Sequence, residues 1–504
     1  MPADKMILNA LQNAVGLENV STNTAVLASY SATGSFQYGS GRSDVPDFVV
    51  MPRTTEQVQD VLRIADRYRV PVVPVSSSVG SCRPVYGGIV LDMSEMNHIL
   101  DINVEDGYAL IEPGVTFGQL QGALRAKGYR IPFGSFPPTI SVFGPETRNS
   151  NITMRGAYGM DDTLCFEFVL PDGTVVRSGS AAFNRGNWNM PYGPYPYIGG
   201  LMLQSEGIYG VVTKYSVRIY PMHERQEMPV VAFDDFPSSI AWQSRVCRAR
   251  LVEHVVNFHY NMMGFFNALY GETDDRLSQQ LLNQHLVAAK AGTPSYEKPP
   301  HMPYNMNVAV LSGTDAQVEN DLEVIDRCAR ELGGRTLSEK EARDHAGPTY
   351  EGWWEHSYRD HILPSRDGGI RGKFLVSIGS IVILLPPSKM KLAERDLMQR
   401  YWQEGFPSWY YSQPFDQNRT AFLRLRTAVP LGETPEEEAE RDRMLNTTRR
   451  LLSYVMQQYG AVPHIKNRTQ EGDQLQQAYG YYTCLRKIKQ GLDPNDILNP
   501  GFLV

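Results

Sequence analysis

Two periodicities run through this chain, one typical of helices and one typical of strands. The apolar residues of TEQVQDVLRIADRYR (55–69) fall on one helical face, and Thr54 or Thr55 stands where an N-cap belongs. Apolar and polar residues alternate in CFEFVLPDGTVVRSGS (165–180) on both sides of Pro171-Asp172-Gly173, which predicts a β-hairpin. The pattern as a whole predicts a protein of the α+β class.

The character of the chain changes after about residue 223. Between residues 47 and 222, short strands surround loops rich in Gly and Ser, whereas beyond them strands such as MNVAVLSG (306–313) alternate with long helices such as 437–460. A chain of 504 residues also exceeds what a single hydrophobic core usually supports. We therefore expect two domains.

Composition excludes several classes of partner. The formal net charge of −7 argues against nucleic acid or an anionic membrane surface as a partner. No run approaches the ~18 apolar residues that span a bilayer, and residues 1–16 predict an amphipathic helix rather than a signal peptide. The five cysteines are scattered without a CxxC pair, which favours reduced thiols and a cytoplasmic location.

A loop of small residues joins two apolar runs in PVVPVSSSVGSCRPVYGGIVLD (71–92). Its serines and glycines offer backbone N–H groups and hydroxyls of the kind that bind a phosphate or pyrophosphate. It matches neither GxxxxGK[ST] nor GxGxxG, so a nucleoside triphosphate or a dinucleotide on a Rossmann fold is not indicated. From the loop alone, a tight structural turn is an equal alternative.

Five further segments recur with this loop, in the same order, in one protein family. They are PGVTFGQL (113–120), GSFPPTISVFG (134–144), RNSNITMRGAYG (148–159), YIGGLMLQSEGIYGVVTKYSVRIYP (197–221) and KQGLDPNDILNPG (489–501). Together they make the chain resemble the flavoproteins grouped with vanillyl-alcohol oxidase and para-cresol methylhydroxylase. No single motif is specific, but the order and spacing are.

The resemblance implies an FAD-binding domain of two α+β subdomains, with an α+β cap domain over the flavin. We expect the FAD-binding domain at 1–223, the cap with the substrate pocket at 224–487, and a tail at 488–504 that returns to the FAD-binding domain. The cofactor implied is FAD.

The resemblance also implies which residues contact FAD. The Ser/Gly loop would wrap the pyrophosphate, and two other segments would line the rest of the cofactor. The loop residues are Ser76, Ser77, Ser78, Val79, Gly80, Ser81, Gly87 and Gly88. The residues beside the ribityl chain and isoalloxazine ring are Pro138, Thr139, Ile140, Gly144, Asn151 and Ile152. Those near the pyrimidine or adenine end are Gly210, Val211 and Val212.

The family oxidises para-substituted phenols by hydride transfer from the benzylic carbon to flavin N5. Its members stabilise the substrate phenolate with a loop tyrosine, a Tyr-Arg pair late in the chain and often a terminal basic residue. Tyr86 matches the loop tyrosine, but Val462 and Pro463 stand at the Tyr-Arg pair, and Phe502 stands at the basic residue. Most of the phenolate-binding set is therefore missing.

Other residues are candidates to replace it. Arg424 and Arg426 share a strand face with Phe422 and would bind an anionic substrate, although arginines on a strand are often simply solvated. His464 is a candidate base or cation, with a structural role as the alternative. Asp161 stands where the family often has an acid beside the flavin, with Asp162 as an equally plausible neighbour.

No metal site is expected, because His356 and His361 are five residues apart and do not share a helix face. The family's covalent flavin tether, a His or Tyr in the cap, belongs near GSIVILLPPSKMKL (379–392), which contains neither residue. We therefore expect non-covalent FAD.

The sequence favours an FAD-dependent oxidase or dehydrogenase that takes a hydride from a benzylic carbon of an aromatic alcohol, a para-substituted phenol or a phenyl ether. Two alternatives stay open: an FAD enzyme acting on 2-hydroxy acids, and a flavin-binding subunit without its own chemistry. The expected partners are an aromatic substrate, an electron carrier such as a cytochrome, and further copies of the chain in a homo-oligomer such as a homodimer.

Overall fold

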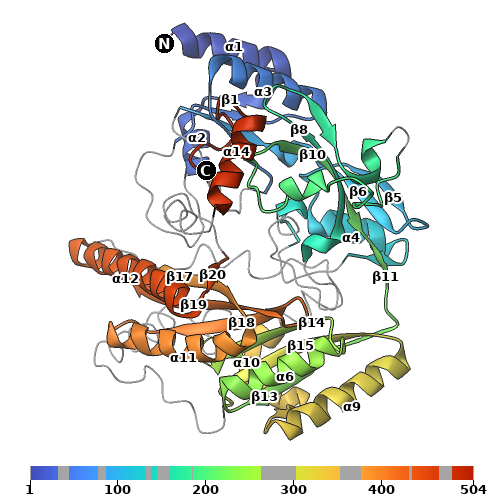
Figure 1. Ribbon diagram of the computed structural model, residues 1–504, viewed down its shortest axis with the longest axis vertical. Coiled ribbons are helices and arrows are strands. Elements are labelled where there is room, and N and C mark those ends of the chain that lie inside the picture. The colour runs from blue at the N-terminus through green and yellow to red at the C-terminus, as the bar shows by residue number, and fades with distance from the viewer. Residues whose placement is uncertain are drawn as a thin grey trace.

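The computed structural model describes residues 2–31, 45–77, 87–131, 138–144, 159–183, 186–260, 262, 302–351, 376–430, 434–464 and 480–502. These residues form two lobes (Figure 1). The upper lobe of Figure 1 contains the N-terminal elements, in blue to green, together with the C-terminal helix in red. The lower lobe contains the elements that lie between these two parts in the sequence. The α+β class is confirmed.

The upper lobe begins with a small sheet under helices. The order of the strands is β1-β2-β4-β3, and β2, β4 and β3 run parallel. Their bounds are β1 Val20–Ser21, β2 Phe48–Val50, β3 Val72–Val75 and β4 Ile89–Asp92. The helices are α1 Pro2–Val15, α2 Thr24–Ser31 and α3 Thr55–Tyr68. Thr54 caps α3 by accepting a hydrogen bond from the Gln57 N–H, as the sequence predicted.

The second sheet of this lobe is antiparallel, in the order β5-β6-β10-β8-β9. The strands are β5 Ile99–Asn103, β6 Tyr108–Ile111, β8 Thr163–Val169, β9 Val175–Arg177 and β10 Val211–Arg218, with helix α4 Phe117–Arg125 beside them. Strands β8 and β9 are the hairpin expected around Pro171-Asp172-Gly173. Strands β7 (Tyr129–Arg130) and β11 (Tyr220–Pro221) form a short antiparallel ladder, and after β11 the chain passes into the lower lobe.

The lower lobe is built on a nine-stranded sheet. The order is β16-β13-β15-β14-β18-β19-β17-β20, with β12 also paired to β15, and the pairs are antiparallel. The strands are β12 Arg225–Glu227, β13 Val230–Phe233, β14 His254–His259, β15 Asn305–Gly313, β16 Arg335–Thr336, β17 Val376–Leu385, β18 Trp409–Phe415, β19 Thr420–Pro430 and β20 Val462–Pro463. The helices are α6 Phe236–Arg248, α9 Asp315–Glu331, α10 Glu339–Glu351, α11 Pro387–Gln403 and α12 Pro435–Tyr459.

Helices α11 and α12 cover one face of the strands β17 and β19. Ile381, Ile383, Leu423 and Leu425 are fully buried in the same cluster as apolar residues of both helices. Because side chains alternate along a strand, the even-numbered residues of β17 and β19 point to the opposite face. That face carries Arg424 and Arg426.

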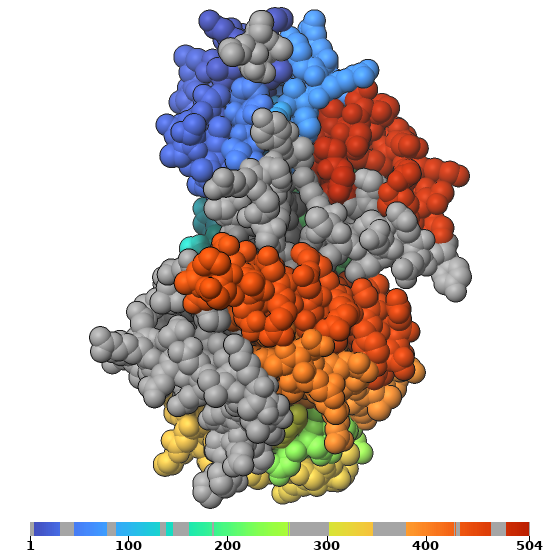
Figure 2. Space-filling model, turned by 90° about the vertical axis from the view of Figure 1, so that its left-hand side faces the viewer, coloured from blue at the N-terminus to red at the C-terminus, as the bar shows by residue number. Residues whose placement is uncertain are grey.

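The C-terminal segment returns to the upper lobe. Helix α14 (Tyr481–Leu492, red in Figures 1 and 2) lies against the upper lobe. Residues 497–499 then run beside β3, where the Val72 N–H donates to the Ile497 carbonyl (2.7 Å) and the Asn499 N–H donates to the Val72 carbonyl (2.8 Å). Leu485 packs against the upper-lobe core, so the return begins before residue 488.

Within the described ranges, none of the helices combines the length and the apolar character that crossing a membrane requires.

Candidate functional site

The described ends of the Ser/Gly loop meet a second segment of the upper lobe. Ser76 and Ser77 follow β3 directly, and Ser141 Oγ donates a hydrogen bond to Ser76 Oγ at 2.9 Å. A Cβ added to Gly144 would lie 3.8 Å from the same Ser76 oxygen. The fold thus brings together two segments that the sequence assigned to FAD. Ser78, Val79, Gly80, Ser81, Tyr86, Asn151 and Ile152 lie outside the described residues.

The backbone on both sides of this junction is held in place by hydrogen bonds. The Gly88 carbonyl accepts from the N–H groups of Asp47 (2.9 Å) and Phe48 (3.2 Å). Gly87 has φ +75°, a conformation that favours glycine. The carbonyl of Pro138 accepts from the Gly118 N–H in the first turn of α4 (2.9 Å). Small residues, hydroxyls and an anchored backbone suit the close approach of a pyrophosphate, so the described residues fit FAD.

The third predicted FAD segment lies at the start of β10. Val211 and Val212 are buried in two different hydrophobic clusters. A Cβ on Gly210 would come within 2.9 Å of the Phe168 ring on β8, so the close packing of two strands already accounts for the glycine. Contact of these three residues with FAD stays a prediction.

The two neighbouring aspartates differ in their surroundings. Both belong to a short 3₁₀ helix, Gly159–Asp162, just before β8. Asp162 is buried and accepts a hydrogen bond from the Tyr220 hydroxyl at 2.6 Å. Burial and the Asp162 carboxylate raise the pKa of Tyr220 well above its usual value. Asp162 therefore has a structural partner. Asp161 is half-buried, and its place beside the flavin stays a prediction.

The lower-lobe candidates gather on one face of the large sheet. Arg424 on β19 pairs directly with Tyr411 on β18 and with Val382 on β17. Arg424 Nη1 lies 3.3 Å from the Tyr411 hydroxyl, and Arg424 Nε lies 3.3 Å from Ser380 Oγ. The guanidinium carbon of Arg426 lies 5.7 Å from the centroid of the Tyr411 ring. Two cations thus flank one phenol.

The chemistry of Tyr411 reflects these two cations. Burial by itself would raise the pKa of its hydroxyl, but the positive charges of Arg424 and Arg426, with the hydrogen bond from Arg424, lower that pKa below its usual value. The arrangement favours negative charge on an oxygen at this place. Sequence reasoning missed Tyr411, because its position beside the arginines depends on the register between β18 and β19.

His464 joins the same face through its aromatic neighbours. Its backbone N–H donates to the Val382 carbonyl (2.9 Å), which extends the pairing of β20 with β17. Its ring stands edge-on to Phe422 with centroids 5.2 Å apart, and lies 5.9 Å from Phe415. The structure therefore brings His464 and the two arginines onto one sheet face, as candidates that are far apart in the sequence.

Val462 and Phe502 stand at two positions of the family's phenolate-binding set, and they lie in different surroundings. Val462 on β20 pairs with Leu384 and is exposed. Phe502 is 1% exposed and packs into the core of the upper lobe. Phe502 is therefore a core residue in this protein, which explains why an apolar side chain stands there.

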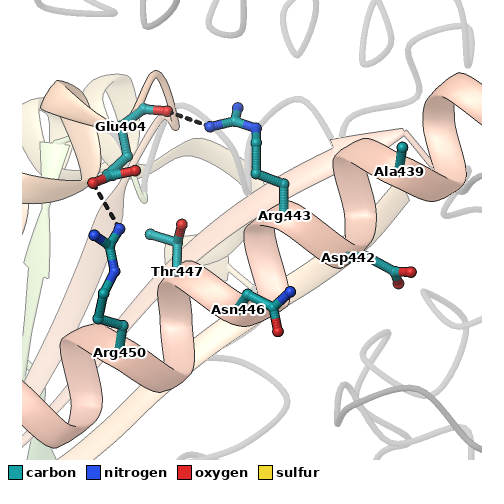
Figure 3. Close-up of a pocket in the computed structure, with 7 residues that line it drawn as sticks. All are labelled: Glu404, Ala439, Asp442, Arg443, Asn446, Thr447 and Arg450. Atoms are coloured by element: carbon teal, nitrogen blue, oxygen red, sulfur yellow. Dashed lines mark hydrogen bonds and ion pairs between the residues drawn. The ribbon is translucent and has the colours of Figure 1, made fainter.

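A surface groove of about 650 Å³ is lined by α12 and by Glu404 at the end of α11 (Figure 3). Its two arginines are already engaged: Arg450 pairs with the Glu404 carboxylate at 2.6 Å, and Arg443 donates to the Glu404 carbonyl at 2.7 Å. Figure 2 shows α12, in orange, on the surface of the lower lobe. The groove does not include any candidate catalytic residue.

The free energy of unfolding should depend on pH because of one buried carboxyl group in the lower lobe. Glu394 on α11 is 3% exposed, and its Oε1 lies 3.3 Å from the Tyr304 hydroxyl. Burial raises its pKa from 4.5 to about 7, although hydrogen bonds from Tyr410 and Tyr304 lower it in part. The folded protein therefore keeps this proton up to about pH 7, whereas the unfolded chain loses it near pH 4.5. The contribution to stability falls as pH rises between these values and is constant above them.

We expect Glu394→Gln to raise the free energy of unfolding at pH 8 by up to about 3 kcal/mol and at pH 5 by no more than about 1 kcal/mol. Denaturant unfolding of both proteins at the two pH values measures this. Glu436→Gln, on the exposed first turn of α12, is the matched control and should change neither value. An equal effect of Glu394→Gln at pH 5 and pH 8 would contradict the prediction.

Comparisons with known proteins agree with this geometry. Residues 46–179 match the family model described as FAD binding domain. The chain is 26% identical over 496 residues to the 4-cresol dehydrogenase [hydroxylating] flavoprotein subunit of Pseudomonas putida, covering 90% of this chain and 87% of that protein. It is 29% identical over 249 residues to the glycolate oxidase subunit GlcD of Bacillus subtilis. That second match spans 48% of this chain and only about half (51%) of the relative.

The fold as a whole also has solved counterparts. The crystal structure of p-cresol methylhydroxylase with substrate bound superposes with a TM-score of 0.80 at 20% identity, covering 100% of this chain and 97% of that one. The chain is thus a flavoprotein whose cofactor is FAD. It is an FAD-linked oxidoreductase that resembles the flavoproteins grouped with vanillyl-alcohol oxidase and para-cresol methylhydroxylase, in sequence over 90% of its length and in fold.

Proposed function

We propose that the protein oxidises an aromatic substrate, an aromatic alcohol or a para-substituted phenol, and that Arg424 and Arg426 bind the phenol oxygen of such a substrate as an anion. The observation that supports this is the placement of both guanidiniums around Tyr411, on one face of the large sheet of the lower lobe. Bound FAD supplies the hydride acceptor, at N5, for the benzylic carbon of the substrate.

The arginines are suited to this role because of the bonds that a guanidinium forms. The two hydrogen-bond contacts of Arg424 described above are to hydroxyl groups, those of Ser380 and Tyr411. An anionic substrate oxygen that reached the guanidiniums would form charge-assisted hydrogen bonds, which are about twice as strong as those between neutral groups. Hydrogen bonds to charged groups are worth about 1.5–3 kcal/mol each in folded proteins. This set would replace the Tyr-Arg pair that Val462 and Pro463 have displaced.

The remaining candidates have roles consistent with this proposal. Tyr86 would contact the substrate oxygen from the flavin loop, and Asp161 would lie beside the flavin. His464 would accept the proton that an alcohol loses as its carbon is oxidised. Electrostatic stabilisation of this kind is usually the largest single contribution to catalysis.

Anaerobic mixing of the yellow protein with defined substrates tests the proposal. We expect 4-alkylphenols or aromatic alcohols to bleach the flavin absorbance. The matched control is 4-tert-butylphenol, which has the same phenol but no benzylic hydrogen and should leave the colour unchanged. Bleaching by none of the aromatic compounds would reject the proposal.

A second candidate is the oxidation of 2-hydroxy acids. It is favoured by the similarity to the glycolate oxidase subunit and by the arginine pair, since a carboxylate is also an anion that arginine binds well. The described residues contain no group of three or more His, Cys, Asp or Glu that could hold a metal ion. If only glycolate or lactate bleaches the flavin, this candidate replaces the first. If nothing does, the chain would be a flavin-binding subunit without its own chemistry.

We further propose that FAD is not covalently attached and that an electron carrier, such as a cytochrome, reoxidises it. The absence of His and Tyr from 379–392 supports the first point, and the relative named a flavoprotein subunit supports the second. Acid precipitation should release the yellow colour into the supernatant. Colour that stays with the pellet would contradict non-covalent binding.

A further inference from the structure

A cluster of charged and polar side chains, three of them buried and one partly exposed, lies where the chain passes from the upper lobe to the lower one. It consists of Arg130, His223, Glu253 and Ser312, which we call the junction cluster. Arg130 belongs to β7 of the upper lobe and His223 to the crossing between β11 and β12. Glu253 precedes β14 and Ser312 lies on β15, both in the lower lobe. Figure 1 shows β11 at this crossing.

The contacts of the cluster join the lobes directly. Arg130 Nη1 lies 2.5 Å from Glu253 Oε1, and Arg130 Nη2 contacts His223 Nε2. The Ser312 hydroxyl donates to Glu253 Oε2, and His223 Nε2 lies 3.5 Å from the same oxygen. Arg130 is 6% exposed and Glu253 is 8% exposed. The ion pair is therefore closed off from solvent.

The backbone around the cluster is equally constrained. Arg130 pairs with Tyr220 across the β7–β11 ladder, and the Met222 N–H donates to the Gly128 carbonyl at 2.9 Å. The Glu253 N–H donates to the Val310 carbonyl at 2.7 Å. Each charged side chain thus projects from a backbone that is anchored in its own lobe. A change in the angle between the lobes would have to stretch or break the ion pair.

Stability alone is a weak reason for this arrangement. Burying two charges removes their hydration, so a buried ion pair generally adds little compared with a well-packed apolar pair. What the ion pair adds is direction, since a guanidinium and a carboxylate attract strongly only in a narrow geometry. Burial would raise the pKa of Glu253, but the charge of Arg130 and the hydrogen bonds from its neighbours hold it well below its usual value. Glu253 is therefore ionised at neutral pH.

We propose that the junction cluster fixes the angle between the lobes, and that Arg130 and Glu253 are positioning residues for the reaction. The segments that fit FAD belong to the upper lobe, whereas Arg424 and Arg426 belong to the lower lobe. The distance from a substrate bound at the arginines to the flavin therefore depends on the angle between the two lobes. A displacement of about 1 Å in such a geometry can slow a reaction on the order of 100-fold. This link to the reaction rests on the proposed function, whereas the fixed angle does not.

The double variant Arg130→Met/Glu253→Gln tests the proposal. It removes both charges together, so neither is left buried without its partner, and glutamine still offers an oxygen to Ser312. The matched control is Arg245→Met/Glu331→Gln, which removes an exposed ion pair within the lower lobe, outside the segment whose amide exchange is followed. Hydrogen exchange of the amides at 219–227, thermal unfolding, and flavin reduction by the substrate that bleaches the wild type are compared.

For the double variant we expect amide exchange at 219–227 to be at least tenfold faster, with a thermal midpoint within about 5 °C of the wild type. At saturating substrate, flavin reduction should be at least tenfold slower, while the substrate Kd changes less than threefold. The control pair should match the wild type in all three. The proposal would be overturned if the double variant had the wild-type rates of amide exchange and of flavin reduction.

A conservative variant covers the case in which the double variant does not fold. Glu253→Asp keeps the charge but withdraws the carboxylate by one methylene, and should give intermediate exchange and reduction rates. Wild-type values for Glu253→Asp in both measurements would also overturn the proposal. If no aromatic substrate reduces the wild type, the proposed function fails, but the exchange measurement still decides whether the cluster fixes the lobes.

Discussion

Replacing Arg424 and Arg426 together by methionine should slow flavin reduction by an anionic aromatic substrate at least 100-fold. Methionine keeps most of the side-chain volume but removes both guanidiniums from the sheet face around Tyr411. Two charge-assisted bonds of about 1.5–3 kcal/mol each are then lost, and each 1.4 kcal/mol in the barrier is a factor of ten. Arg424→Ala alone should cost at least tenfold.

Stopped-flow absorbance of the oxidised flavin measures these rates. The matched control is Arg419→Met in the turn between β18 and β19, where Arg419 is exposed and pairs with Asp416 at 2.8 Å. That variant should react as the wild type does. A double variant whose rate stays within threefold of the wild type would show that the arginines do not bind the substrate.

The largest expected effect on the cofactor comes from Gly88→Asp. Gly88 is buried just before β4, at the described end of the Ser/Gly loop, and its carbonyl is fixed by Asp47 and Phe48. If this loop binds the FAD pyrophosphate, the new carboxylate meets a negative charge. Two like charges about 4 Å apart repel by about 4 kcal/mol at an effective dielectric constant of 20, which predicts a loss of affinity on the order of 1000-fold.

Gly88→Asn is the control, because asparagine has the size of aspartate without its charge. We expect purified Gly88→Asp to contain no flavin and to fail reconstitution with added FAD, while Gly88→Asn retains most of it. Circular dichroism checks that both variants fold. Flavin bound equally well by Gly88→Asp and the wild type would place the pyrophosphate elsewhere.

Local signals in the sequence were sufficient for much of the fold. Helix α3 was predicted from its apolar spacing and a cap at Thr54 or Thr55, and β8–β9 from alternation around Pro171-Asp172-Gly173. These elements form from residues close in sequence, so periodicity and turn chemistry carry the information. The FAD-binding character was implied by the resemblance to a flavoprotein family that several ordered segments carry, and the match of residues 46–179 to an FAD binding domain agrees with it.

The candidate site could be predicted only in part. The alternation of Phe422, Arg424 and Arg426 follows from the strand period, and so their common face was foreseen. That Tyr411 stands between the two arginines was not, because a one-residue shift in the pairing of β18 and β19 would turn it to the other face. The structural role of Asp162 was likewise invisible, since its partner Tyr220 is 58 residues away.

By itself, then, the sequence determined the α+β class and the main local elements, because each depends on neighbouring residues, and its resemblance to a flavoprotein family implied the cofactor. Only the tertiary structure decided which distant side chains meet. Phe502 became a core residue of the upper lobe through the return of the C-terminal segment. Arg130 and Glu253 became an ion pair although 123 residues separate them. Such contacts depend on the strand register and on the relative orientation of the two lobes, and a local sequence pattern encodes neither.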